Sequence, residues 1–347
     1  MAPSRFKELT SSYRSLRIGV VGDVCLDRYL EIDPAKTERS IETGQPVHNV
    51  VNVRTSPGAA GTVINNLSAL GVKTIYPIGF CGDDAEGFEL RRALKKLPQV
   101  ALRYFETSPL RRTFTYTKPL VVEPGKSPRE LNRLDFKNWT PTPVTLDRKL
   151  ARSISSVAGH VDAIIVLDQV DRPGTGVINR HLLRAVRELA TRNPSMVMLA
   201  DSRRGLRDFP PLIYKMNRAE LGRHGNLRGK LSLDRVRIEA GRLAKENRRP
   251  VFVTLAEGGI IGVSPSGQVE HVPAFPVRGE IDIVGAGDAV TANLAAALAC
   301  GAMMREALEL AMAAASVVVH KLGTTGTASL NETKGVLFGH TKLAGRS

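Results

Sequence analysis

The chain has 347 residues, of which 42% are hydrophobic and 24% charged, a composition typical of a globular protein with a large core. No segment approaches the roughly 20 consecutive apolar residues of a membrane span, and the polar residues 1–16 lack the apolar stretch of a signal peptide, so we expect no membrane association. The formal net charge of +15 leaves nucleic acid or anionic small molecules open as partners.

The cysteine and aromatic content indicates the cellular location and bears on nucleic-acid binding. Cys25, Cys81 and Cys300 lie far apart and are odd in number, so we expect neither disulfides nor a zinc site, and we expect a cytoplasmic location. Residues 203–249 hold 14 Lys and Arg against five Asp and Glu. Because aromatic residues make up only 5% of the chain, a platform for stacking nucleic-acid bases is not expected.

The first strong pattern is RIGVVGD, residues 17–23, a β-branched run that ends in glycine and aspartate. Such runs are typical of central parallel strands, and open α/β sheets bind ligands at the carboxyl ends of these strands. Asp23 and Asp27 are therefore candidates for binding substrate hydroxyls. Turn formation or capping explains Asp23 equally well and Asp27 less well.

Two segments, at about residues 28–54 and 112–136, alternate polar and apolar side chains. This alternation predicts antiparallel strands with one solvated face, and we expect both segments to form one small β lid. Exposed edges of such a sheet could pair with their equivalents in a homodimer.

A helix is predicted within residues 56–71. Val63, Leu67 and Leu70 fall on one face of it, and Gly71 suits its C-terminal end. The small residues at its start either admit a ligand close to the backbone or allow tight packing, and both interpretations stay open.

The second half of the chain alternates strands and helices. Repeated β-α-β units of this kind predict parallel strands with right-handed crossovers, so we expect an α/β fold with a mostly parallel central sheet flanked by helices. A hairpin-like segment, the last apolar helix and a loosely structured tail follow; the expected strands are 162–168, 195–201 and 250–256, the helices 178–192, 231–247 and 305–322, the hairpin 258–275, and the tail begins at Thr324.

Residues 279–301 predict an extended segment, a glycine turn and an alanine-rich helix. The turn, Gly285, Ala286 and Gly287, exposes backbone N–H groups that favour an anion such as phosphate. Asp288 follows on the first helical turn, where it could act as the base in phosphoryl transfer. An acidic residue that only complements the helix dipole explains the same pattern.

A second pair of polar residues follows the strand-like LIYKM. Asn217 and Glu220, three residues apart, fall on one face of a helical turn, where they could hold a hydrated magnesium ion near phosphates. Ordinary surface polarity is the alternative.

The order of these motifs resembles the PfkB-type, ribokinase-like carbohydrate kinases over nearly the whole chain. The order is GD after the first strand, a two-part lid, a small-residue helix start, NxxE, and DxxGAGD before a helix. Within this family, GDVCLDRY, ELNRLDF, FVTLAEGGI and AAASVVVHKLGTTGTAS are most similar to the kinase domains of bacterial ADP-heptose synthesis enzymes. The resemblance implies a ribokinase-like fold over residues 17–330, with 1–16 as a leader and 331–347 as a tail.

The resemblance also implies roles for individual residues. Asp288 would deprotonate a sugar hydroxyl, the amides of Gly285, Ala286 and Gly287 would hold the transferring phosphoryl group, and ATP with Mg²⁺ would be the donor. The remaining implied contacts are Asp27, Gly58 and Thr62 for the sugar, Lys118 and Arg133 for a substrate phosphate, Asn217, Glu220, Thr254, Glu257, Gly258 and His320 for the nucleotide, Asn217 and Glu220 for Mg²⁺ through water, and Asp282 for a monovalent cation such as K⁺.

Several positions depart from the family pattern. Thr62 replaces a sugar-contacting asparagine, Leu120 an arginine, Met312 an asparagine and His320 a glycine, while DQVDRPG stands for DYxKG. The phosphoryl-transfer centre is retained more fully than the sugar site, so the kinase assignment is firmer than any heptose assignment. No HxGH motif is present, so a bifunctional nucleotidyltransferase is not expected.

The leading hypothesis is thus an ATP-dependent kinase of a sugar or sugar phosphate. A nucleoside kinase on the same fold is one alternative. The other is a non-catalytic nucleotide or nucleic-acid binder that uses the basic residues 203–249.

Overall fold

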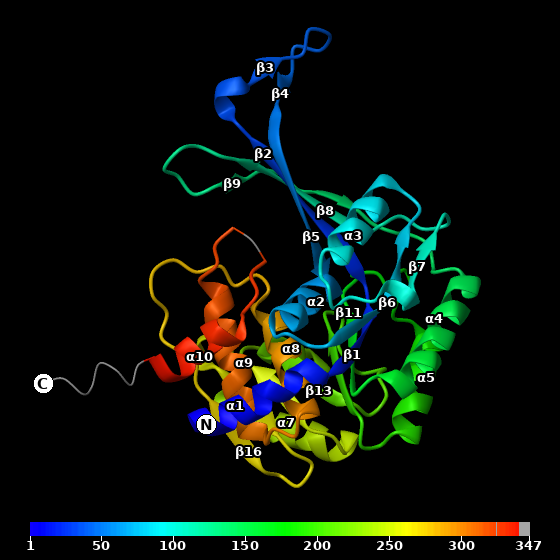
Figure 1. Ribbon diagram of the computed structural model, residues 1–347, viewed down its shortest axis with the longest axis vertical. Coiled ribbons are helices and arrows are strands. Elements are labelled where there is room, and N and C mark those ends of the chain that lie inside the picture. Colours follow the sequence, from blue (N-terminus) through cyan, green and yellow to red (C-terminus); the bar gives the residue numbers. More distant parts are fainter. Residues whose placement is uncertain (324, 340–347) are drawn as a thin grey trace, which may run out of the picture.

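The central sheet of the computed structural model, which describes residues 1–323 and 325–339, contains nine strands in the order β16-β15-β14-β13-β12-β11-β1-β6-β7 (Figure 1). From β7 to β14 all neighbouring strands pair in parallel. The pairs β14–β15 and β15–β16 are antiparallel. The prediction of a mostly parallel sheet with one hairpin is therefore confirmed. The strands are β1 (Arg17–Gly22), β6 (Thr74–Gly82), β7 (Phe105–Ser108), β11 (Ala163–Asp168), β12 (Val197–Ser202), β13 (Ile213–Asn217), β14 (Val251–Thr254), β15 (Ile260–Val263) and β16 (Val269–Val272).

Helices cover both faces of this sheet. Because side chains alternate along a strand, Ile18 and Val20 of β1 pack into one hydrophobic cluster and Val21 packs into the other. The first cluster holds residues of α1 (Pro3–Ser11), α2 (Ala60–Ala69), α3 (Ala85–Lys95), α8 (Ala286–Ala299) and α9 (Met304–Val319), with α10 (Leu330–Phe338) against it; the second holds residues of α4 (Val144–Val157), α5 (Arg180–Arg192), α6 (Arg218–His224) and α7 (Leu233–Asn247).

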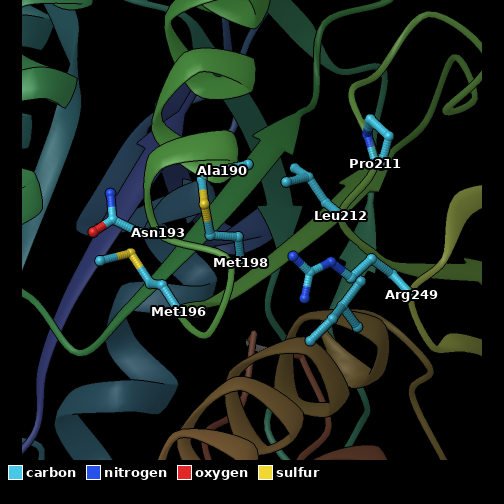
Figure 2. Close-up of a pocket in the computed structure, with 8 residues that line it drawn as sticks. Ala190, Asn193, Met196, Met198, Pro211, Leu212 and Arg249 are labelled. Atoms are coloured by element: carbon cyan, nitrogen blue, oxygen red, sulfur yellow. The ribbon is translucent and has the colours of Figure 1, made fainter.

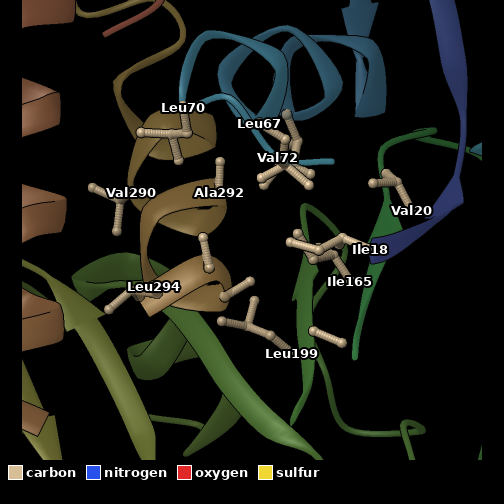
Figure 3. Packing of buried hydrophobic residues seen from close by; sticks show 14 of the residues in the cluster. Ile18, Val20, Leu67, Leu70, Val72, Ile165, Leu199, Val290, Ala292 and Leu294 are labelled. Carbon is tan, nitrogen blue, oxygen red and sulfur yellow. The ribbon is translucent and has the colours of Figure 1, made fainter. Parts of the chain in front are cut away.

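Helix α8 is the central element of the first face. It is apolar nearly all round, and residues 289–297 are all buried, which is typical of a helix enclosed by other elements. Figure 3 shows Val290, Ala292 and Leu294 of this helix near Leu67 and Leu70, on the side of the sheet that carries Ile165 and Leu199. The N-terminus of α8 is thereby fixed relative to the sheet.

A second sheet projects from the core as a lid (Figure 1). Strand β2 (Val24–Ile32) continues almost directly from β1 and pairs with β5 (Val50–Ala59) and β8 (Thr115–Val121). The expected small sheet is confirmed, but the expectation that it is antiparallel is wrong in part, because β2 and β8 pair in parallel. Its other strands are β9 (Arg129–Glu130) and β10 (Leu134–Phe136), and β3 (Glu38–Arg39) and β4 (Pro46–Val47) form a separate hairpin at its tip.

The N-terminal leader is part of the fold rather than an appendage. It contains α1, whose Phe6 and Leu9 are buried in the first cluster together with Tyr13. Arg5 pairs with Glu306 of α9 at 3.0 Å, which joins the leader to the C-terminal half of the chain. The leader therefore packs against the core of the domain.

The chain beyond residue 324 was expected to be loosely structured, and this expectation is wrong for the residues described. Residues 330–338 form α10, which begins with a capping box between Ser329 and Glu332. Residue 324 and residues 340–347 lie outside the described part.

The expected extended segment before the glycine turn, residues 279–284, forms no strand in the described chain.

Candidate active site

Polar residues gather at the carboxyl edge of the central sheet, where successive strands end. This edge is where open α/β sheets bind ligands. It carries Asp23 after β1, Asp168 at the end of β11, Asp201 near the end of β12, Asn217 at the end of β13 and Thr254 at the end of β14.

Asp23 has a structural role at this edge. Its buried carboxylate accepts hydrogen bonds from the backbone N–H groups of Val177 at 2.6 Å and Gln169 at 3.2 Å, so it holds the loop after β11. Burial raises the pKa of Asp23 to about 6. Of the two interpretations of this residue, loop formation is the one that the geometry supports.

The glycine turn stands at the N-terminus of α8. Gly285 is the N-cap residue with φ of 85°, a left-handed conformation that suits glycine, and a Cβ atom there would lie 2.8 Å from Cγ2 of Thr325. Ala286 and Gly287 form the first turn of the helix, whose first backbone N–H groups have no partner within the helix; the Ala286 N–H donates to the Ile283 carbonyl at 3.3 Å. The turn therefore offers an anion-binding end of a buried, 14-residue helix.

Asp288 lies on this first turn and makes no side-chain hydrogen bond or ion pair with any described residue. Burial raises the pKa of its carboxyl to about 7; Lys215 opposes this shift, while Asp201 adds to it. A carboxyl group with a pKa near neutrality can accept a proton from a substrate and release it afterwards.

A buried ion pair that the sequence analysis did not single out lies beneath Asp288. The ammonium of Lys215 contacts the Asp201 carboxylate at 2.7 Å, and each residue is only 6% exposed. A Cβ atom on Gly287 would lie 3.2 Å from Nζ of Lys215, so the amine approaches the anion-binding turn. Burial alone would lower the pKa of Lys215, but Asp201 holds it above its ordinary value. The sequence signal was a single lysine inside the apolar strand LIYKM.

Asn217 and Glu220 form the capping box of α6. The Asn217 side chain accepts the Glu220 N–H at 2.9 Å, and the Glu220 carboxylate accepts the Asn217 N–H at 2.7 Å. Burial raises the pKa of Glu220. One Glu220 carboxylate oxygen is left for a water or ion, so the pair is a helix cap first and could touch a hydrated metal only through that oxygen.

The residues expected to border the nucleotide lie beside this cap. Thr254 is the register partner of Asn217 in the parallel β13–β14 pair. Glu257 and Gly258 follow in the turn after β14, where the Gly258 carbonyl contacts Nε2 of His271 at 2.8 Å. These residues therefore lie next to one another at the sheet edge.

Asp27 lies in β2, at the root of the lid, and is 7% exposed. Its side chain has no hydrogen-bond or ion-pair partner among the described residues. Burial raises its pKa, and Lys118, Arg133 and Arg203 act in the opposite direction. A Cβ atom on Gly58 would collide with its carboxylate, so the glycine at this position is required for the approach of β5.

Thr62 connects this region to the anion-binding turn. It is buried on the first turn of α2, and its Cγ2 would lie 3.6 Å from a Cβ atom on Gly285. Thr62 therefore packs beside the anion-binding turn, while Asp27 and Gly58 lie together at the root of the lid.

The two basic lid residues differ in their contacts. Arg133 is bound in two places to Asp135, at 2.7 and 2.8 Å, and lies over the Tyr116 ring. Lys118 lies over the Tyr29 ring, 5.0 Å from its centre, and forms no ion pair within the described chain. Arg203, from the loop after β12, is exposed and likewise unpaired among the described residues. Its charge acts on both Asp27 and Asp288, and the sequence analysis did not identify it.

Asp282 and His320 serve the loop that precedes the turn. Asp282 accepts the Val284 N–H at 3.0 Å through one carboxylate oxygen. Both ring nitrogens of His320 are occupied within the chain, by Ser316 and Arg278. This leaves His320 no free nitrogen for a nucleotide.

Six of the 14 Lys and Arg residues in the basic segment 203–249 form ion pairs among the described residues. Arg235 and Arg242 both contact Glu239, at 3.0 and 3.1 Å, and Arg237 contacts Asp234 at 3.2 Å. Arg204 contacts the buried Asp168 at 2.7 Å. These contacts neutralise part of the positive charge of the segment within the fold.

A small pocket lies at the opposite, amino end of the strands (Figure 2). It is lined by residues such as Met198, Leu212 and Arg249 and has a volume of about 10 Å³, which is room for one water molecule at most. It therefore cannot be a substrate site. Within the described residues, no cluster of three or more His, Cys, Asp or Glu could hold a metal ion, and no helix is long and apolar enough to cross a membrane.

A central, mostly parallel sheet with a lid rooted at its carboxyl edge is also the fold of solved sugar kinases. The similarity to solved structures agrees: ribokinase from Arabidopsis thaliana, solved with ribose and ATP, superposes with a TM-score of 0.66 at 21% identity over 93% of this chain and 99% of that one. Phosphofructokinase-2 from Escherichia coli, solved with potassium, gives 0.67 at 20% identity over 93% and 98%.

The chain belongs to the pfkB family of carbohydrate kinases, whose model matches residues 20–331. Similar curated proteins include the bifunctional protein HldE of Hyphomonas neptunium, 30% identical over 96% of this chain, and that of Magnetococcus marinus, 32% identical over 92%. The chain spans 66% and 63% of these two relatives, slightly less than two thirds.

Proposed function

We propose that the protein transfers the γ-phosphoryl group of ATP to a hydroxyl of a sugar or sugar phosphate, with Asp288 as the general base. The observation that carries this proposal is the position of Asp288: a carboxyl with a pKa of about 7 and no partner among the described residues, on the first turn of a helix that begins with a glycine turn. The base would take the hydroxyl proton, and the amides of Gly285, Ala286 and Gly287 would hold the phosphoryl charge.

The acceptor would lie between the lid root and α8, against Asp27, Gly58 and Thr62. Lys118 of the lid and Arg203 of the core form no ion pair among the described residues. Two such positive charges favour an acceptor that carries a phosphate group of its own. Arg133 is held by Asp135, so we assign it a supporting role. Lid closure over this site would exclude water from the reaction.

The nucleotide would lie along Asn217, Thr254, Glu257 and Gly258. The charges of Asp201, Glu220 and Asp288 all act on Lys215, and this concentration of acids fits a Mg²⁺ ion that arrives with the nucleotide phosphates rather than a resident one. When bound, Mg²⁺ would neutralise charge on the phosphates. Asp282 keeps one carboxylate oxygen available for a monovalent cation such as K⁺.

The experiment that tests this function is ADP release from ATP with a panel of monosaccharides, their phosphate esters and nucleosides. We expect at least one sugar or sugar phosphate to stimulate ADP release at least tenfold over the acceptor-free rate, with a product of matching mass. A response to nucleosides alone would establish the nucleoside kinase alternative. No response to any acceptor would refute the proposed reaction.

The lid also supports the expected homodimer. Strand β5 is the edge of the lid sheet, and its Val51 and Val53 are 44% and 47% exposed. We therefore propose that two copies pair along this edge and predict a solution mass of twice the 37.6 kDa chain by light scattering. A mass of one chain at micromolar concentration would contradict this pairing.

A further inference from the structure

The side chain of His320 joins two segments that are far apart in the sequence. His320 directly follows α9, and its Nδ1 lies 2.6 Å from the Ser316 carbonyl oxygen on the same helix. Its Nε2 accepts the backbone N–H of Arg278 at 3.0 Å, 42 residues earlier in the chain. The ring therefore bridges the end of α9 and the loop that leads to the anion-binding turn.

These contacts determine the tautomer of the neutral ring. A backbone N–H can only donate, so the Nε2 atom that faces Arg278 carries no proton. In the neutral ring the proton is then on Nδ1, where it is donated to the Ser316 carbonyl. Both nitrogens are thus used, each in the role that its partner requires.

The same loop has two more contacts with the last turn of α9. The Asp282 N–H donates to the Val319 carbonyl at 2.8 Å. A Cβ atom on Gly285 would lie 3.8 Å from Val318, so the turn itself packs close to this helix. Between these points, residues 278–284 have no regular secondary structure and are mostly exposed. Hydrogen bonds to α9, rather than burial, hold this loop.

We propose that His320 is a positioning residue for the anion-binding turn. By fixing Arg278 to the end of α9, it sets the path of residues 278–284 and hence the direction of the amides at the start of α8. This inference rests on the proposed phosphoryl transfer, in which these amides hold the reacting group.

The test is a matched pair of variants, His320→Gln and His320→Asn. A glutamine amide reaches the position of Nε2 and can accept the Arg278 N–H, whereas an asparagine amide reaches only the position of Nδ1 and can bond Ser316 alone. The readouts are hydrogen exchange of residues 278–286 in the free protein, thermal stability, and kcat and KM for ATP and the acceptor.

We expect exchange of the Arg278 amide to rise at least tenfold in His320→Asn and to stay near the wild-type rate in His320→Gln. We also expect kcat to fall on the order of tenfold in the asparagine variant only, because small displacements of catalytic groups have large effects on rate. The proposal is wrong if both variants exchange like wild type, or if exchange rises in His320→Asn while kcat is unchanged. Exchange is measured without substrate, so it tests the bridge even if no acceptor is found.

Discussion

Replacement of Asp288 by asparagine is expected to lower kcat by on the order of 10³-fold while ATP affinity changes by less than about twofold. Asparagine has nearly the same shape but cannot accept the hydroxyl proton. Calorimetric titration with a non-hydrolysable ATP analogue would measure the affinity, and single-turnover kinetics would measure the chemical step.

The matched control is Asp282→Asn, the same change six residues earlier. An asparagine oxygen can still accept the Val284 N–H, so we expect kcat of this variant to fall only a few-fold at saturating K⁺.

The pH profile of the wild-type protein gives a second measure of the role of Asp288. Because the base must be unprotonated and its pKa is about 7, kcat/KM should rise between about pH 6 and about pH 8 and then level off. Full turnover in Asp288→Asn would remove Asp288 from the mechanism.

The parts of the fold that local sequence determines were predictable. Val63 and Leu67 of α2 and its C-cap residue Leu70 are buried as their spacing predicts, and Gly71 has φ of 76° after the helix. The parallel pairing of β2 with β8 was not predictable, because alternation looks the same in either strand direction. Pairing direction depends on how the chain returns to the lid, which is a tertiary property.

The N-terminal helix shows a second limit. Residues 3–11 are mostly polar, with only Phe6 and Leu9 as large apolar residues, so periodicity alone gave little sign of a packed helix. Its position depends on Arg5 and Glu306, which are separated by 301 residues. A pair so distant in sequence cannot be inferred from one chain without its fold.

The candidate site was predictable where a motif carries its own geometry. Gly285 and Asp288 lie at a helix start as expected, because glycine conformation and helix capping are local. Asn217 and Glu220 were identified for metal binding, yet the same spacing is that of a capping box, which is how they bond. Lys215 and Asp201 were missed because a buried ion pair arises only when strands β12 and β13 are placed side by side.

Loss of the Lys215 ammonium is expected to have the largest effect on stability. In Lys215→Met, the buried Asp201 carboxylate would keep only the Thr291 hydroxyl at 3.2 Å as a partner. An uncompensated buried charge costs about 3–5 kcal/mol, so the free energy of unfolding should fall by that amount in urea titrations at neutral pH.

The double variant Lys215→Met/Asp201→Leu separates the pair from the packing around it. Removing both charges leaves no unpaired ion, and the double variant should regain most of the lost stability. If the free energy of unfolding of the single variant is within about 1 kcal/mol of wild type, or the double variant is as unstable as the single one, the pair does not act as described.

Lys215→Met should also change the pH dependence of the reaction, because Lys215 lowers the pKa of Asp288. The remaining activity of Lys215→Met should therefore require a higher pH than that of the wild type. Lys215 would then contribute both to the stability of the sheet edge and to the pKa of the Asp288 base.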